Sequence, residues 1–245
     1  MSRFYVPPTF IHASRIRVPK DESHHIIDVM RLGKGDIVSV FDGTGKFYEG
    51  KIVSTRHNEV IIDIEHESTQ LPQPKVQISL AQAIPKKEKM EYIIEKVTEL
   101  GIQKIIPFVS TRTVVRLREG RSEHRIERWR KIAVSSSKQS GRSTLPELCN
   151  IADFEKVMEY TRQYDSVIMP CLSLKSTSLY SALRRPVKWK RVLVITGPEG
   201  GFTDEEVNLA SEHAVLLVSL GNLVLKSDTA AISTVSILHY RLNLQ

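Results

Sequence analysis

The sequence predicts an α/β protein in two parts, a small β-barrel followed by a larger, mainly parallel sheet with helices on both faces. Three observations lead to this prediction. Short strand patterns separated by turns fill the first part, a stretch with two prolines and no periodicity follows at 68–75, and strands then alternate with helices. The predicted domains are residues 1–70 and 74–245.

The barrel prediction rests on three adjacent strand patterns. Apolar and polar residues alternate in "GDIVSVFDG", "KFYEGKIVSTR" and "EVIIDIEHE", with turn signals at 42–45 and 57–58 between them. One short helix is expected before them, over about 22–32, with Asp21 or Ser23 as its N-cap. The glycine pairs at 33–35 and 43–45 are interpreted as hairpin turns because no helix follows them.

The second part alternates between strand and helix patterns. Buried strands are expected at "VQISLAQAI", "KIIPFVS", "SVIMP", "VLVITG" and "VLLVSLG". The helix after the first of these places five apolar residues on one face, and Thr203 and Glu206 form a capping box for a later helix. Asp228 is interpreted as the cap of the last helix. Such alternation implies parallel strands covered on both faces.

Composition favours a cytoplasmic protein and gives no sign of a membrane span or a metal site. The chain has 245 residues, 41% hydrophobic and 26% charged, and "MSRFYVPPTF" lacks the apolar region of a secretory signal. No apolar run reaches the length of a membrane helix. Two cysteines are too few for a disulfide framework or a zinc site, and the eight histidines lack metal-ligand spacing.

Positive charge is concentrated in one segment. Residues 110–142 hold ten Lys or Arg against three Asp or Glu, which equals the +7 of the whole chain. Arginine predominates eight to two, and its planar guanidinium suits bidentate phosphate contacts. A solvated basic helix is the alternative, but the pattern is typical of a protein with a polyanionic partner.

Three late strands end in unusual loops, namely "MPCLSLKS", "GPEGGFT" and "LGNLVLKSDTA". Ligands of parallel sheets bind beyond the carboxyl ends of the strands, so three such loops predict a single pocket. "GPEGG" is not a phosphate loop, because no Gly-Lys-Ser/Thr follows, and its glycine spacing differs from the dinucleotide fingerprint. Its small residues instead leave room for a flat, polar ligand such as an adenine or a ribose.

"ITGPEGGFTDEE" and "SLGNLVLKSDTAAISTVSIL" resemble the paired C-terminal signatures of the SPOUT methyltransferases, and more narrowly those of the ribosomal RNA small subunit methyltransferase E family. Matches elsewhere are "HHIIDVMRLGKGD", "FDGTG", "EKVTELGI" and "SSSKQSGR". The resemblance implies a PUA-like RNA-binding barrel, a SPOUT domain with a deep trefoil knot over about 168–240, and a homodimer. The implied activity is methylation of uridine N3 at position 1498 of 16S rRNA in the small ribosomal subunit, with S-adenosylmethionine and without metal.

The resemblance, the late loops and the charge pattern together give candidate site residues. Arg142 is the preferred catalytic candidate for holding the target base or its phosphate, Gln139 for contacting a uracil edge, and Glu199 either for acid–base chemistry or for ordering its own loop. The predicted cofactor-binding residues are Pro170, Leu172, Thr196, Gly197, Pro198, Gly200, Gly201, Leu220, Gly221, Leu225, Thr229 and Ala230. The predicted RNA-binding residues are Arg112, Arg125, Arg128, Lys138, Arg142 and Lys226.

Four positions depart from the family pattern. Leu223 stands where the family has arginine, Lys226 replaces a second arginine, Asp228 replaces glutamate, and Lys138 stands where glutamate is common. Leu223 loses the charge altogether, and this residue together with Lys138 motivates an alternative in which the chain is a non-catalytic RNA- or ribosome-binding protein on the same fold. A phosphate-loop nucleotide hydrolase is the other alternative, weakened by the missing Gly-Lys-Ser/Thr.

Overall fold

The computed structural model describes residues 3–69, 74–115, 121–184 and 188–244. The chain forms two compact units. One comprises Met1–Pro72 and Val134–Leu145, and the other comprises Gln73–Ala133 and Pro146–Gln245. The segment Val134–Leu145 therefore packs with the N-terminal unit, whereas the sequence places it in the second domain.

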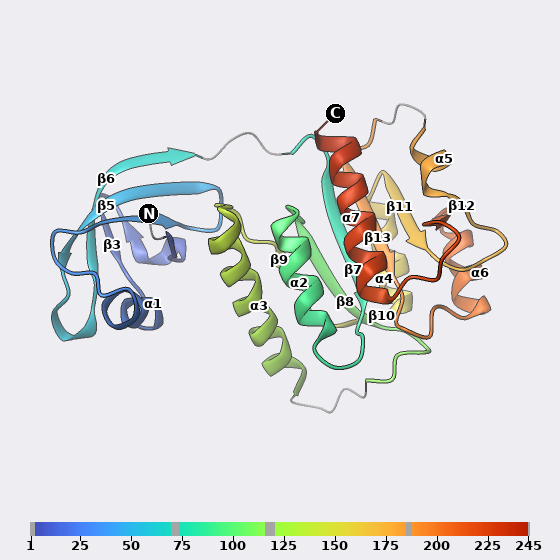
Figure 1. Cartoon of the computed structure of the whole chain (residues 1–245), viewed down its shortest axis with the longest axis horizontal. Coiled ribbons are helices and arrows are strands. Elements are labelled where there is room, and N and C mark those ends of the chain that lie inside the picture. Colours follow the sequence, from blue (N-terminus) through green and yellow to red (C-terminus); the bar gives the residue numbers. More distant parts are fainter. Residues whose placement is uncertain (1–2, 70–73, 116–120, 185–187, 245) are drawn as a thin grey trace. The chain divides into compact units, whose positions relative to one another are not determined.

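The N-terminal unit is built on a curled sheet in the order β1-β4-β5-β6-β3-β2 (Figure 1, blue to cyan). Strand β1 pairs with β4 in parallel and the other pairs are antiparallel. Phe4, Ile16, Ile52 and Ile62 belong to its buried core. The strands are β1 (Arg3–Tyr5), β2 (Ile11–His12), β3 (Arg15–Arg17), β4 (Ile37–Phe41), β5 (Lys46–Ser54) and β6 (Ile61–Thr69).

The predicted hairpin turn at 43–45 joins β4 to β5. The Asp42 carboxylate accepts hydrogen bonds from the backbone and the hydroxyl of Thr44, at 2.8 and 2.9 Å. Gly43 and Gly45 have φ of +82° and +114°, values that L-residues rarely adopt. The interpretation of this glycine pair as a turn is confirmed.

The early helix differs from its prediction. It comprises α1 (Lys20–His24) and a π-helical turn η2 (His25–Val29), with Pro19 at the N-cap and no capping side chain. The proposed caps Asp21 and Ser23 are therefore wrong. Buried Ser23 instead donates its hydroxyl to the Val18 carbonyl at 3.1 Å and accepts from the Val60 backbone at 3.3 Å, which fastens the helix to the sheet.

The C-terminal unit contains a parallel sheet in the order β10-β8-β7-β13-β11-β14-β12, with β9 beside β8. The predicted parallel sheet is confirmed. Its strands are β7 (Gln77–Ala83), β8 (Lys104–Val109), β9 (Glu147–Leu148), β10 (Ala152–Asp153), β11 (Ser166–Pro170), β12 (Thr177–Ser178), β13 (Arg191–Thr196) and β14 (Leu216–Ser219).

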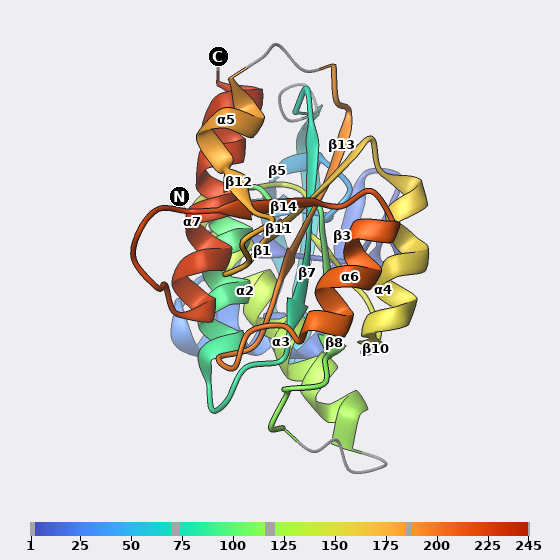
Figure 2. The same cartoon turned by 90° about the vertical axis from the view of Figure 1, so that its right-hand side faces the viewer.

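Helices cover both faces of this sheet, as predicted. Figure 2 shows α2 and α7 on one face and α4 and α6 on the other. The helices of this part of the chain are α2 (Lys89–Glu99), α3 (Arg121–Ser140), α4 (Phe154–Tyr160), α5 (Leu179–Leu183), α6 (Asp204–Glu212) and α7 (Ser227–Asn243). Three short 3-10 turns complete the described elements: η1 (Pro8–Phe10), η3 (Arg56–Asn58) and η4 (Thr161–Gln163).

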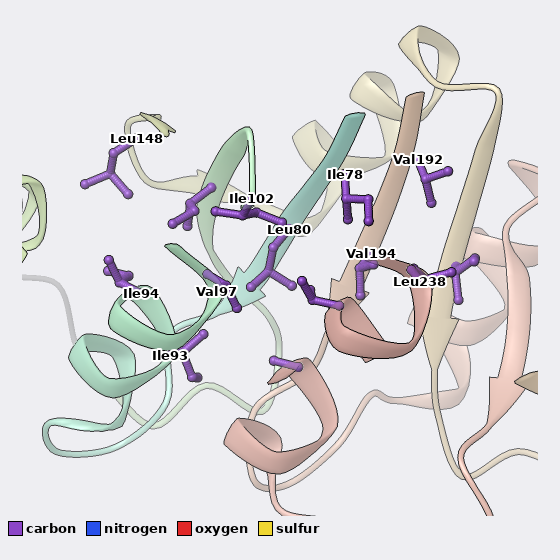
Figure 3. Packing of buried hydrophobic residues seen from close by; sticks show 14 of the residues in the cluster. Ile78, Leu80, Ile93, Ile94, Val97, Ile102, Leu148, Val192, Val194 and Leu238 are labelled. Carbon is purple, nitrogen blue, oxygen red and sulfur yellow. The ribbon is translucent and has the colours of Figure 1, made fainter. Parts of the chain in front are cut away.

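Alternation along each strand divides the core into two layers. Ile78 and Leu80 of β7 belong to the layer under α2 and α7, whereas Ala81 and Ala83 face the opposite layer. Figure 3 shows the first layer, where Leu238 of α7 approaches the strand residues. Each fully buried aliphatic side chain of this kind contributes about 1.5–3 kcal/mol relative to exposure. Two hydrophobic layers therefore hold the strand ends, and the loops that leave them, in fixed positions.

The two late helices begin in different ways. Helix α6 has the predicted capping box, in which Thr203 and Glu206 bond each other's backbone. Helix α7 begins at Ser227 with Lys226 at the N-cap and no capping side chain, so the prediction that Asp228 caps it is wrong. Asp228 lies two residues after the N-cap position and stands instead in the first turn, where a carboxylate is favoured by the helix dipole. Across the described residues, no helix has the length and apolar character needed to cross a membrane.

Candidate functional site

One pocket of about 500 Å³ lies where the chain leaves β11 and β13 and enters α7. The loops predicted to form a single site do converge there. A smaller adjoining cavity of about 80 Å³ shares several of the same residues and adds the loop after β14. Predicted cofactor residues that line the larger pocket are Pro170, Leu172, Thr196, Gly197, Pro198, Gly200, Gly201, Leu225 and Ala230.

The remaining predicted cofactor residues, in and after the loop that follows β14, do not all line a cavity. Leu220 and Gly221 line the smaller cavity, as does Leu223, the residue that stands in place of the family arginine. Thr229, predicted to bind the cofactor, is exposed on the first turn of α7 and lines neither cavity. The structure thus brings together all the predicted cofactor residues except this one.

Glycines shape the wall formed by "GPEGG". A Cβ at Gly197 would lie 3.0 Å from the Phe202 ring, and one at Gly200 would lie 3.2 Å from Cβ of Arg112. Gly201 has open space around it but a φ of +68°, and its N–H closes a turn onto the Pro198 carbonyl at 2.9 Å. Close packing at two positions and backbone conformation at the third therefore account for three glycines in five residues.

Glu199 ties this loop to the start of α2. Its carboxylate accepts from Nζ of Lys89 at 2.7 Å and from the Lys86 backbone N–H at 3.2 Å. Partial burial acts to raise the pKa of Glu199, but these hydrogen bonds outweigh it and the pKa is lowered. Glu199 is therefore ionised and paired at neutral pH, which corresponds to the loop-ordering role that the sequence left open.

The loop after β8 braces the same wall, which the sequence analysis missed. The Nη1 atom of Arg112, predicted to bind RNA, donates to the carbonyls of Gly200 and Phe202 at 3.0 Å each. Buried Glu206 accepts from the backbone N–H groups of Thr111 and Thr203, both at 2.9 Å. Neither the Arg112 bonds nor the bond between Thr111 and Glu206 has a sequence signal, because each joins segments about 90 residues apart.

A buried hydrogen-bond chain also escaped the sequence analysis. Gln82 at the end of β7 bonds Ser227, and Ser227 bonds the carbonyl of Gly197. The one available signal was a glutamine inside the apolar run "LAQAI" at the end of this strand.

The two preferred catalytic candidates lie in the other unit. Arg142 is partly buried, its Nε and Nη2 atoms lie 3.4 and 3.2 Å from Oγ1 of Thr144, and burial lowers its pKa to about 10. Gln139 lines a concavity of the N-terminal unit together with Arg3, His25 and Lys138. The pocket residues all belong to the C-terminal unit, so joint action with Arg142 and Gln139 stays a prediction.

The predicted RNA-binding residues have different surroundings. Lys138 pairs with Glu22 inside the N-terminal unit, and Arg128 pairs with Glu91 at 2.8 Å. Lys226 is exposed at the N-cap of α7. Part of the basic segment, 116–120, lies outside the described residues. Within the described residues no cluster of three His, Cys, Asp or Glu side chains has a metal-binding arrangement.

Comparison with known proteins gives a consistent result over nearly the whole chain. Residues 72–239 match the RNA methyltransferase domain, and residues 18–65 match the RNA methyltransferase PUA domain. The ribosomal RNA small subunit methyltransferase E of Rickettsia conorii is 30% identical over 96% of this chain and 93% of its own length. The chain belongs to the ribosomal RNA small subunit methyltransferase E family.

Two further members support the alignment of this family across both units. The enzyme of that name from Bacillus subtilis is 29% identical over all of this chain and 98% of its own length. A crystal structure of the Neisseria gonorrhoeae member bound to S-adenosylmethionine has a TM-score of 0.86 and 27% identity, covering 98% of this chain and 97% of that one. The family expected from the glycine-rich loop and its partner loop is confirmed. The knot was expected from the same resemblance and stays a prediction.

Proposed function

We propose that this protein uses S-adenosylmethionine to methylate ribosomal RNA, and that its target is N3 of a uridine, position 1498 of 16S rRNA, in the small ribosomal subunit. The observation that carries the proposal is the convergence of the "GPEGG" loop, the loop after β11 and the start of α7 on one pocket in a member of this family. The family relationship supports the methyl transfer to rRNA, and the uridine rests on the motif resemblance.

The pocket residues fit the proposed cofactor. Pro170, Leu172 and Leu225 offer apolar surface to a planar base, and the glycines of 197–201 allow close approach of backbone N–H groups. Oγ1 of Thr196 is buried and has no hydrogen-bond partner among the described residues, so a polar ligand group would satisfy it. When bound, S-adenosylmethionine supplies an electrophilic methyl group.

The residues of the chain then have two tasks, positioning and charge stabilisation. Methyl transfer by in-line displacement depends strongly on the alignment of the reacting atoms, and loops held by buried contacts provide that alignment. Uridine N3 carries a proton and becomes a good nucleophile as the proton leaves, so a nearby cation favours the reaction. We assign that cation to Arg142, because a pKa of about 10 leaves its guanidinium charged at neutral pH.

Glu199 is a poor choice for removing the proton. Its lowered pKa makes the carboxylate a weak base, and Lys89 already occupies it. We therefore assign Glu199 to loop order and Gln139 to the uracil edge, where an amide offers both a donor and an acceptor.

The arginine-rich segment is proposed to bind the RNA backbone. Replacing Arg125, Arg128 and Arg142 with alanine is expected to weaken RNA binding and to flatten its dependence on salt, because fewer counterions are then released. Filter binding at several salt concentrations measures the slope. An unchanged slope would place the RNA face elsewhere.

A homodimer is proposed from an apolar groove on the C-terminal unit. The groove, about 680 Å³, lies between α5 and α7, and Tyr180, Ile237 and Tyr240 line it with exposed side chains. Exposed aromatic and aliphatic residues gathered in one groove are typical of a protein interface. Light scattering should give a molar mass of twice the 27.8 kDa chain mass, and Tyr240→Glu should reduce the molar mass to that of a single chain.

The proposed reaction is tested with tritiated S-adenosylmethionine and small ribosomal subunits that lack the modification, followed by base-resolved mapping. Label at N3 of the proposed uridine supports the assignment. Label at another nucleotide would correct the target, and binding of the subunit without any label would favour the non-catalytic alternative motivated by Leu223.

A further inference from the structure

Three buried polar side chains meet beside the pocket, at the junction of β7, β13 and α7. Gln82 and Thr196 are register partners near the carboxyl ends of their strands, and Ser227 begins α7. All three are buried, and Gln82 is completely inaccessible. A buried amide is costly unless it is hydrogen-bonded, so its partners indicate what it does.

The Gln82 amide nitrogen is the donor in both of its hydrogen bonds. Its Nε2 donates to Oγ of Ser227 at 3.0 Å and to the backbone carbonyl of Ala83 at 2.8 Å. Since the Ala83 carbonyl can only accept, the amide nitrogen must face it. Ser227 therefore accepts from Gln82 and gives its own proton to the carbonyl of Gly197, at 2.6 Å.

The end of this chain of bonds is the first residue of "GPEGG". Gly197 starts the glycine-rich wall, and Ser227 starts the helix whose first turns carry Ala230 into the opposite wall. A buried chain of bonds thus connects two walls of the pocket. Its three residues come from distant parts of the sequence, since Gln82 and Ser227 are 145 residues apart and Gly197 and Ser227 are 30 residues apart.

We propose that Gln82 is a positioning residue of the cofactor site, which acts through Ser227 to hold the Gly197 carbonyl and the start of α7 at one separation. The inference rests on the proposed cofactor. The polar cluster is poorly suited to a purely stabilising role, because Oε1 of Gln82 and Oγ1 of Thr196 are buried with no hydrogen-bond partner in the described part of the chain. Unsatisfied polar atoms of this kind reduce stability, and apolar replacements of similar shape can be neutral.

Isothermal titration of S-adenosylmethionine into the full chain tests the proposal. Gln82→Met and Ser227→Ala are each expected to weaken binding about tenfold, the effect of one buried hydrogen bond. The double variant should be about as weak as either single variant, because both residues act in one chain of bonds. In methylation assays the KM for S-adenosylmethionine should rise while kcat changes less.

Thr234→Val is the matched control. Thr234 is also a buried hydroxyl on α7, but it bonds the Ala230 carbonyl within its own helix at 2.7 Å. This variant should bind the cofactor as the wild type does. Wild-type affinity in Gln82→Met, or effects that simply multiply in the double variant, would overturn the positioning role. Failure of the wild-type protein itself to bind S-adenosylmethionine would instead refute the proposed function.

Discussion

Gly201 offers the sharpest test of the pocket wall, because its surroundings separate backbone conformation from side-chain crowding. Apart from its two chain neighbours, no atom of the described residues lies within 4 Å of the place where a Cβ would stand. Its φ of +68° lies in the left-handed region, where an L-residue costs about 1–2 kcal/mol and a β-branched one costs more. Asparagine tolerates this region better.

The affinity for S-adenosylmethionine should therefore fall in the order Gly201→Asn, Gly201→Ala, Gly201→Val. If the loop relieves the strain by leaving the binding conformation, about 1–2 kcal/mol corresponds to roughly 5- to 30-fold for alanine. Calorimetric titration measures the affinity, and thermal melting checks the fold. Gly33 is the matched control, because it also has open space but no positive φ. Equal losses for asparagine and valine would refute the backbone argument.

Three further changes test neighbouring contacts. Arg112→Ala should weaken cofactor binding about tenfold, because it removes two hydrogen bonds from the loop. RNA binding is measured in parallel, and a loss of RNA binding with unchanged cofactor affinity would support the RNA-binding role predicted for Arg112 instead. Glu199→Gln should raise the KM for S-adenosylmethionine several-fold, whereas a kcat loss of about a hundredfold or more would identify a general base. Burial raises the pKa of Cys171 and raises that of Cys149 to about 11, so both thiols should react slowly with an alkylating reagent at pH 8 and faster as the pH rises. The cofactor should protect Cys171, which lines the pocket, but not Cys149, and mass spectrometry measures the alkylation of each.

The parts of the fold that sequence reasoning predicted are those set by local patterns. Alternation and turn residues identified the hairpin at 43–45, and the strand–helix alternation identified the parallel sheet. The capping box at Thr203 and Glu206 was readable because its two members stand three residues apart. The family signatures then predicted which loops form the cofactor pocket.

What the sequence did not reveal has two physical causes, helix starts that lie a few residues from the apparent cap and contacts distant in sequence. Asp21 looked like a cap, but Pro19 starts the helix and Ser23 bonds the sheet instead. Asp228 looked like a cap because the pattern cannot show that α7 begins at Ser227, with Lys226 at the N-cap. The RNA-binding role of Arg112 stays a prediction, but its two carbonyl partners about 90 residues away could not be read from the sequence.

The Glu206 carboxylate links two amides that belong to different parts of the chain. Thr203 N–H belongs to the start of α6, and Thr111 N–H belongs to the loop after β8, yet one buried side chain accepts from both. If the Glu206 side chain moves away and both hydrogen bonds break, the two amide protons become exposed to solvent together. Their hydrogen-exchange rates should therefore rise together when Glu206 is replaced by alanine, and a bound cofactor should slow both. The exchange rates of these two amides would thus report local opening of the whole pocket wall.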